Sequence, residues 1–185
     1  RMIQKIVLAM LMFSCIALPA QNRKGGHKML VAYFSHSGNT RTVAQAISEA
    51  TGADLFEIIP QQNYPTDYSS LLDVAKREIN AHKHPDLKER VKDFEAYDVI
   101  FIGSPNWWST VAPPVATFMK SYDFSGKTVV PFMTHGGGRF GHAIDDLKAL
   151  CPEATFLDGL SVRDGSVSTC RPEVDKWLKR LNLLK

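Results

Sequence analysis

The stretch Ser35-His36-Ser37-Gly38-Asn39-Thr40 separates an apolar run, residues 29–34, from a segment with helical spacing. A short loop of small polar residues between a strand and a helix is typical of a phosphate-binding site. Backbone N–H groups at a helix N-terminus carry partial positive charge, and Ser and Thr hydroxyls add nearby donors. Gly38 lets the turn tighten where a side chain would block a ligand. A helix cap without a ligand is the alternative, because Ser, Thr and Asn are the usual caps.

Strand-like apolar segments alternate with helical segments along the rest of the chain. Five strands are expected, at residues 29–34, 54–59, 97–102, 127–133 and 154–157. Helices are expected at about residues 40–50 and 67–81, after Pro113, around residues 143–150, and after about Cys170. This alternation predicts an α/β domain with a parallel sheet.

Two of the expected strands carry further information about the sheet. The strand at residues 97–102 is apolar nearly throughout, which suits a parallel sheet covered on both faces. Pro131 lies inside the strand at residues 127–133 and cannot donate a hydrogen bond to a neighbouring strand. We therefore expect a local irregularity there, and an irregular stretch between residue 157 and about Cys170.

The composition is that of one globular domain. The chain has 185 residues, of which 44% are hydrophobic and 22% are charged. Its formal net charge is +3, and residues 1–20 contribute two of these charges through Arg1 and Lys5, which leaves +1 for the remainder. A near-neutral domain lacks the clustered basic face of a nucleic-acid binder, so no nucleic-acid partner is expected.

Residues 1–20 differ from the rest of the chain. Lys5 precedes an apolar run, residues 6–18, which is shorter than the roughly 20 residues needed to span a bilayer. A basic residue followed by such a run is typical of a secretory signal peptide. A lipoprotein leader with lipid attachment at Cys15 is the competing interpretation, and it would be the protein's one link to a membrane. Both interpretations predict an exported protein, periplasmic or associated with the cell envelope, with residues 21–28 as a linker and 29–185 as the folded domain.

Cysteine and histidine do not form a recognisable metal motif. Cys151 and Cys170 remain beyond the leader, and they are either a disulfide or two free thiols. His82 and His84 have the spacing of metal ligands, but no other ligand group is evident nearby, and a solvated loop is the preferred interpretation. We expect no metal site.

Three unusual loops are expected at one edge of the sheet, because they follow the first, third and fourth strands. Ligands of open α/β sheets bind beyond the carboxyl ends of the strands. The second loop, residues 103–110, carries Trp107 and Trp108, and at least one of them could stack on a flat aromatic ligand. The third contains Gly136-Gly137-Gly138, whose bare backbone could approach a planar heterocycle. The alternative is that the tryptophans pack under a helix and the glycines only turn the chain.

In order and spacing the three loops resemble those of the flavodoxin family, especially flavodoxin-like proteins with a Trp-Trp middle loop. The resemblance covers about residues 29–184. It implies a flavodoxin-like three-layer sandwich with a five-stranded parallel sheet in the order 2-1-3-4-5, the order known for flavodoxins. In that order the three strands that precede the loops are neighbours. The resemblance also implies that FMN is the cofactor.

The resemblance assigns roles residue by residue. The phosphate loop corresponds to Ser35, Ser37, Gly38, Asn39 and Thr40. One side of the flavin ring would be lined by Pro105, Asn106, Trp107 and Trp108. The other side would be lined by Thr134, His135, Gly136, Gly137 and Gly138. Ser109 is a departure, because many members have Gly at that position. None of these residues is expected to be catalytic, since the flavin carries the redox chemistry.

The resemblance implies a FMN-binding electron-transfer protein. The alternative is an FMN-dependent NAD(P)H or quinone reductase, and a third is a scaffold that has kept the fold without flavin. The partner is expected to be a redox protein or a small-molecule electron acceptor. Familiar electron-carrier flavodoxins are strongly acidic and this chain is not, so its partner is expected to differ from theirs.

Overall fold

The computed structural model describes residues 26–185. The expected leader, residues 1–20, and residues 21–25 of the expected linker lie outside the described residues. The described part contains no helix with both the length and the apolar character needed to cross a membrane. It also contains no cluster of three or more His, Cys, Asp or Glu side chains arranged to hold a metal ion.

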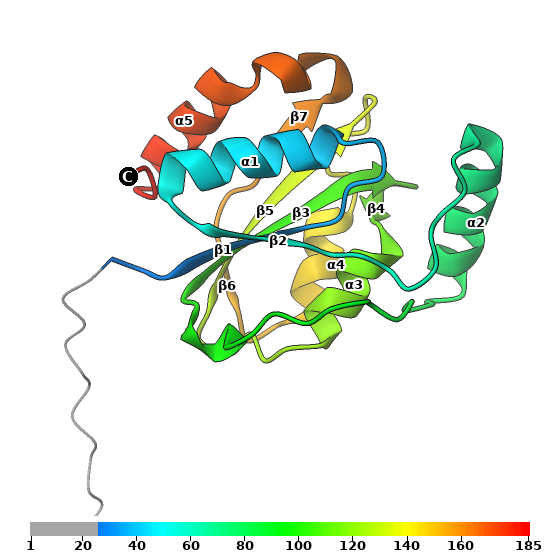
Figure 1. The fold of residues 1–185 in the computed structure, drawn as a ribbon, viewed down its shortest axis with the longest axis horizontal. Coiled ribbons are helices and arrows are strands. Elements are labelled where there is room, and N and C mark those ends of the chain that lie inside the picture. Colours follow the sequence, from blue (N-terminus) through cyan, green and yellow to red (C-terminus); the bar gives the residue numbers. More distant parts are fainter. Residues whose placement is uncertain (1–25) are drawn as a thin grey trace, which may run out of the picture.

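A parallel sheet forms the centre of the molecule (Figure 1). Its strands lie in the order β2 (Asp54–Glu57), β1 (Met29–Tyr33), β3 (Val99–Trp107), β5 (Thr128–His135) and β6 (Thr155–Phe156). The short strand β4 (Thr110–Val111) pairs antiparallel with β3, and β7 (Leu160–Arg163) pairs parallel with β5. Counted by the predicted strands, this is the expected order 2-1-3-4-5.

The edge of the sheet beside β5 is divided between two short strands. β6 pairs with Thr128 and Val129, whereas β7 pairs with residues 132–135. Val129 accepts a hydrogen bond from Leu157 on this edge, so the backbone two residues on, at Pro131, faces the same edge. Pro131 has no N–H to donate there. The irregularity expected from this residue is confirmed, and it coincides with the break between β6 and β7.

Helices cover both faces of the sheet (Figure 1). On one face lie α1 (Asn39–Thr51) and α5 (Arg171–Arg180), together with the 3-10 segment η2 (Asp164–Thr169). On the other lie α3 (Pro113–Lys120), α4 (Ala143–Leu150) and the short η1 (Phe94–Ala96). The three-layer sandwich predicted from the sequence is confirmed.

Helix α2 (Tyr68–Asn80) belongs to neither layer and stands beyond the end of the sheet (Figure 1). It lies within a segment that leaves the body of the protein after β2 and returns at residue 87. An isolated antiparallel bridge between Pro60 and Leu87 closes the base of this segment, and Lys88 N–H donates to Ile59 O at 2.8 Å. We call residues 61–86 the α2 excursion.

The sheet separates two apolar cores. Val31, Ile47 and Trp177 belong to the core under α1 and α5, and Ile100, Phe118 and Met133 belong to the core under α3 and α4. Each core buries one cysteine, Cys151 in the second of these and Cys170 in the first. Both are free thiols, so the disulfide considered from the sequence does not form. Burial raises the pKa of Cys151 to about 11, which keeps it as an inert thiol.

Two expectations about irregular segments were wrong. Residues 103–107 were expected in a loop, but they extend β3, and a two-residue turn then leads into β4. The stretch after residue 157 contains β7 and η2 rather than irregular chain. Both differences add ordered backbone at the carboxyl edge of the sheet, where the candidate site lies.

Candidate functional site

The first loop is braced from inside by Ser35. Its Oγ accepts hydrogen bonds from the N–H groups of Gly38 at 3.1 Å and Arg41 at 3.2 Å. Gly38 adopts φ 96°, the left-handed region that favours glycine, and a Cβ there would meet no atom within 4 Å. The loop is therefore tightly turned but open on its outer side.

The N-terminus of α1 has unused donors. Gly38 is its N-cap and provides no side-chain cap, and the first turn contains no acidic residue. Within the described residues, the N–H groups of Ser37, Asn39 and Thr40 have no hydrogen-bond partner. Free N–H groups at a helix N-terminus form a ready anion site. The alternative read from the sequence, a helix cap without a ligand, explains the hydrogen bonds of Ser35 but leaves these other N–H groups without a partner.

A buried hydrogen bond joins the first loop to the third. Thr40 Oγ1 and Thr134 Oγ1 lie 2.8 Å apart, and both residues are almost fully buried. Thr134 lies near the carboxyl end of β5, and Thr40 lies in the first turn of α1. The two loops that follow the first and fourth predicted strands thus meet directly.

The second loop is a tight hairpin between β3 and β4. Its two turn residues, Trp108 and Ser109, have φ values of 52° and 66°, as a type I′ turn requires. Non-glycine residues are strained in this region. Asn106 stabilises the turn, because its Oδ1 accepts from Ser109 N–H at 2.9 Å while its Nδ2 donates to Arg139 O at 2.6 Å. Asn106 therefore ties the second loop to the third.

The two tryptophans of the hairpin have different surroundings. Trp107 is half-buried and meets the rings of Phe34 and Tyr64 edge-on, with centroids 5.3 and 4.9 Å away. The ring of His36, in the first loop, is 5.9 Å from it. Trp108 remains 45% exposed and turns toward α2, where its Nε1 donates to Leu72 O at 3.0 Å. Trp107 thus packs against aromatic side chains outside the helices, and not under a helix as the alternative interpretation expected.

The third loop combines open glycines with a buried histidine. A Cβ at Gly137 would meet no atom within 4 Å, and one at Gly136 would only approach Asp164 at 3.9 Å. His135 is 8% exposed, and its Nδ1 is buried without a hydrogen-bond partner among the described residues. Burial lowers the pKa of His135; Asp164 opposes this shift, while Arg139 and Arg163 add to it. The ring is therefore neutral near pH 7.

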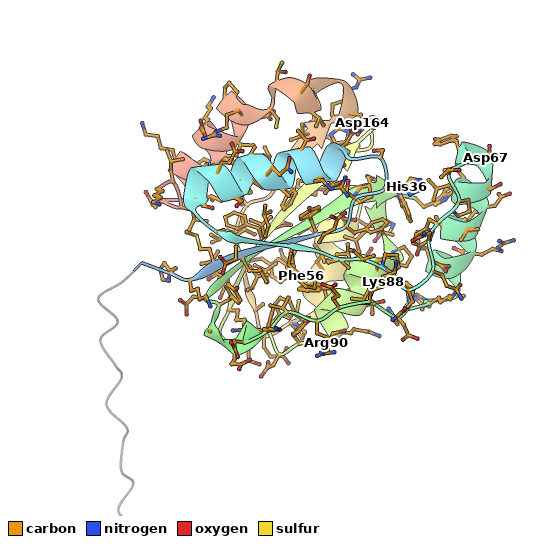
Figure 2. All side chains as sticks on the ribbon, in the orientation of Figure 1. His36, Phe56, Asp67, Lys88, Arg90 and Asp164 are labelled. Atoms are coloured by element: carbon orange, nitrogen blue, oxygen red, sulfur yellow. The ribbon has the colours of Figure 1, made fainter. Side chains whose placement is uncertain are left out.

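Two residues near these loops were missed by the sequence analysis. His36 and Asp164 lie at the same end of α1 (Figure 2). Asp164 begins η2 directly after β7, and β7 was not predicted, so no strand end marked this residue. His36 lies within the predicted phosphate loop, where only its neighbours were assigned a role. The contact of His36 with Trp107 brings the first loop, which precedes α1, next to the hairpin at the end of β3.

The residues present fit a cofactor with one anionic group and one flat ring. Unpaired N–H groups and hydroxyls gather at the start of α1, and open glycines follow β5. The orphaned Nδ1 of His135 leaves a polar group available for a ligand. All three loops are fixed to one another through Thr40–Thr134 and Asn106–Arg139.

The flavodoxin sequence profile matches residues 28–181, most of the chain. The chain belongs to the flavodoxin family. Two solved relatives of this flavodoxin-family protein come from Bacteroides species and are assigned as flavoproteins. The B. uniformis structure is 32% identical, covers 84% of this chain and 99% of its own, and has a TM-score of 0.73. The B. eggerthii structure is 31% identical, covers 84% and 98%, and has a TM-score of 0.71.

A third relative was solved with a ligand. The flavoprotein from Lactobacillus acidophilus NCFM, in complex with FMN, is 28% identical to this flavodoxin-family chain. The match covers 82% of this chain and 99% of that one, with a TM-score of 0.65. No curated protein matches the sequence.

Proposed function

We propose that this chain is an FMN-binding electron-transfer protein that holds the flavin at the carboxyl edge of its parallel sheet. The observation that carries the proposal is the junction of the first and third loops through Thr40 and Thr134. It places a helix N-terminus with free N–H groups beside a glycine-rich strand end. The relative in complex with FMN supports the same ligand.

The phosphate of FMN would be held by the first loop. The free N–H groups of Ser37, Asn39 and Thr40 supply donors, and the dipole of α1 favours negative charge at this point. Ser35 Oγ accepts two backbone hydrogen bonds and still has its own proton to donate. Ser35 would therefore both shape the loop and bind the phosphate.

The flavin ring would lie between the second and third loops. Pro105, Asn106 and Trp107 would line one side, and Thr134 to Gly138 the other, whereas Trp108, assigned to the same side from the sequence, is turned toward α2. FMN, when bound, supplies the electron-transfer chemistry, and the protein supplies binding and electrostatics. His135 presents an unpaired ring nitrogen, and Arg139, whose carbonyl is held by Asn106, adds a positive charge to the same loop. Positive charge stabilises a neighbouring anion, so Arg139 would raise the reduction potential of the flavin.

A reductase acting on NAD(P)H or a quinone is the second candidate. A tryptophan stacked over the flavin would obstruct access for nicotinamide or quinone. Trp108, however, is held against α2 by its bond to Leu72 O and by Lys76, whose Nζ lies 4.8 Å from its ring. This orientation removes one of the two obstructing side chains and favours the reductase more than the sequence did.

The absorbance spectrum of purified protein with added FMN, followed by anaerobic reduction, tests the first proposal. We expect saturable uptake of one flavin and a perturbed flavin spectrum. A colourless protein that fails to take up FMN would overturn the proposal and leave the scaffold interpretation. Steady-state oxidation of NADH or NADPH by the FMN-loaded protein separates the carrier from the reductase, because only the reductase turns over without a partner protein.

A further inference from the structure

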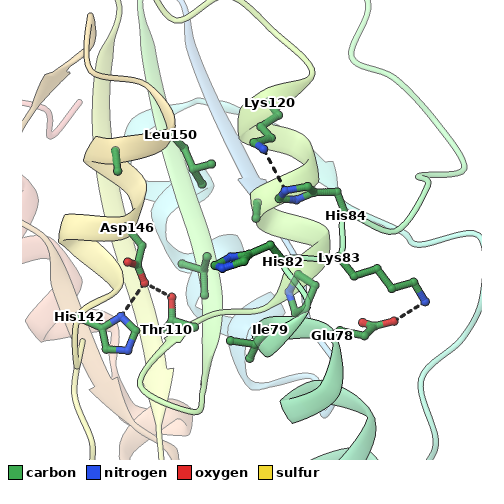
Figure 3. A pocket seen from close by; sticks show the side chains of 14 residues that line it. Glu78, Ile79, His82, Lys83, His84, Thr110, Lys120, His142, Asp146 and Leu150 are labelled. Atoms are coloured by element: carbon green, nitrogen blue, oxygen red, sulfur yellow. Dashed lines mark hydrogen bonds and ion pairs between the residues drawn. The ribbon is translucent and has the colours of Figure 1, made fainter.

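Apart from the proposed FMN site, the structure has a cavity beside β4, which we call the second cavity. It has a volume of about 460 Å³ and lies between the end of the α2 excursion, α3 and α4 (Figure 3). Cavities of roughly 300–1,000 Å³ are typical of sites for small organic ligands. It shares no residue with the proposed phosphate loop or with the third loop.

The floor of this cavity is apolar and its rim is polar. The apolar side chains come from α2, β4, α3 and α4 and comprise Ile79, Val111, Pro113, Ala116, Ala149 and Leu150. Three histidines and two lysines stand around them (Figure 3). An apolar body with a polar group at one end matches this distribution.

The carboxylates of the rim already have partners. Glu78 Oε1 binds Lys83 Nζ at 2.9 Å, and its other oxygen accepts from Tyr64 Oη at 2.5 Å. Asp146 binds His142 Nδ1 at 2.6 Å and also accepts from the Thr110 hydroxyl (Figure 3). Both acids therefore already accept hydrogen bonds, and neither forms an ion pair with Lys120.

Lys120 is the cation of the rim without a counter-ion. Within residues 26–185 it forms no ion pair, and its Nζ lies 3.0 Å from His84 Nε2. An ammonium group can only donate, so His84 Nε2 accepts and the ring is neutral. Burial, Lys120 and His82, in that order of cause, lower the pKa of His84. Lys120, an exposed side chain, therefore presents to the cavity an ammonium group that no carboxylate among residues 26–185 pairs with.

We propose that this cavity binds an organic anion with an apolar body, its anionic group on Lys120 and its body on the apolar side chains of the lining. The anion would provide the counter-ion that Lys120 lacks. The ligand would bridge the α2 excursion and the body of the protein, since Ile79 and His82 come from one and Lys120 and Leu150 from the other. The proposal stands apart from FMN binding, because the two sites share no residue.

The cavity adjoins the hairpin. Thr110 lines the cavity and belongs to β4, and His142, also in the lining, donates its N–H to Ser109 O at 2.8 Å. A Cβ at Gly141 would come within 2.3 Å of the same Ser109 oxygen, so only glycine fits at this close approach. A ligand in the cavity would therefore lie against β4, which pairs with the part of β3 that would line the flavin ring.

Two probes of equal shape and different charge test the proposal. Calorimetric titration of the full chain with 2-naphthoate and with neutral 2-naphthamide is run with excess FMN in solution, which keeps the flavin site from taking up either probe. We expect 2-naphthoate to bind at least fivefold more tightly than 2-naphthamide. Equal binding of the two probes, or no binding of either, would overturn the proposal.

Three variants locate the binding. Lys120→Gln should weaken 2-naphthoate at least fivefold and leave 2-naphthamide within twofold, whereas Lys148→Gln, an exposed lysine on α4 outside the cavity, should change neither. Ala149→Phe, which adds a bulky ring to the lining at an exposed helix position, should weaken both probes. The site would be refuted if wild type and Lys120→Gln bound 2-naphthoate with equal affinity. It would also be refuted if Ala149→Phe, with an unchanged far-UV circular dichroism spectrum, bound both probes as tightly as wild type. Displacement of 2-naphthoate by FMN would also refute it.

The titration of His84 gives a readout that does not depend on calorimetry. An anion beside Lys120 should oppose the effects of Lys120 and His82 and raise the pKa of His84. Side-chain NMR of His84 across pH 5 to 8, with and without 2-naphthoate, measures this. We expect an upward shift with 2-naphthoate and none with 2-naphthamide, and an unchanged titration with bound 2-naphthoate would contradict the placement.

Discussion

Helices α1 and α2 have the same length, 13 residues, and very different support. α1 lies on the sheet and buries six residues, whereas α2 stands beyond the sheet and buries only Leu71 and Ala75. α1 presents its N-terminus to the proposed phosphate site, and α2 forms one wall of the second cavity. The part of the protein that would anchor FMN is thus fixed by the core, and the part beside the hairpin is held mainly by individual polar contacts.

Those contacts can be named. Asp67 caps α2 by accepting from Ser70 N–H at 2.9 Å, and Glu78 is bound by Tyr64 and Lys83. Trp108 donates to Leu72 O from the hairpin. Each such bond contributes on the order of 1 kcal/mol net, because it replaces a bond to water. Regions with few buried apolar contacts open locally at lower free energy than the core.

The largest expected effect comes from a matched pair of substitutions, one in each helix. Ile47→Ala removes a fully buried side chain from α1 and should lower the free energy of unfolding by about 3 kcal/mol. Ile79→Ala removes the same atoms from a half-buried position in α2 and should cost about 1 kcal/mol. Urea unfolding monitored by circular dichroism measures both. Equal losses would show that α2 is as firmly packed as α1.

The next largest effect concerns the junction of the first and third loops. Thr40→Val keeps the shape of the side chain but leaves the Thr134 hydroxyl buried without a partner, which should cost about 2 kcal/mol. It should also weaken FMN binding, since Thr40 lies in the first turn of α1. Calorimetric titration with FMN and urea unfolding measure the two effects.

The double variant Thr40→Val/Thr134→Val provides the control. Removing both hydroxyls leaves no orphaned group, so its stability should recover most of the loss seen in the single variant. Additive losses in the double variant would mean that the two hydroxyls do not depend on each other, contrary to their 2.8 Å separation.

A smaller effect is expected where the hairpin holds α2. Trp108→Phe keeps an aromatic ring and removes the N–H that donates to Leu72 O, a change of about 1 kcal/mol. Amide hydrogen exchange should accelerate about fivefold in α2 and stay unchanged in α1. Exchange that accelerates equally in both helices would indicate a global loss of stability and would contradict separate support for α2.

The sequence was most informative where local pattern and tertiary structure agree. The alternation of apolar strands and helices predicted both layers, and the stretch Ser35–Thr40 does join β1 to the first turn of α1, which begins at Asn39. Pro131 marked the irregular edge because a missing N–H is a property of the residue itself. The side chains of Val43 and Ile47 follow helical spacing, so the buried face of α1 could be read directly.

The features that the sequence did not predict depend on contacts between segments far apart in the chain. β7 has only four residues and follows the break opposite Pro131, so its own pattern is too short to identify. The hairpin turn uses Trp108 and Ser109 at positive φ, against their intrinsic preference, because Asn106 and the segment beginning at Arg139 hold it in place. The separation of Cys151 from Cys170 by the sheet likewise follows from the topology rather than from spacing.

The smallest expected effect is a pH dependence with one histidine in each region. His135, at the end of β5, and His84, in the α2 excursion, both have pKa values lowered chiefly by burial. A lowered folded-state pKa means that the unfolded chain binds the proton more readily than the folded chain does. The contribution of these histidines to stability is therefore complete above about pH 6.5 and falls as the pH drops below it.

The variants His135→Gln and His84→Gln should each flatten this decline. Urea unfolding at pH 7.5 and 5.5, without added FMN, measures it, with His27→Gln as the control for losing a surface imidazole. A decline unaltered by either substitution would assign the acid sensitivity to other groups.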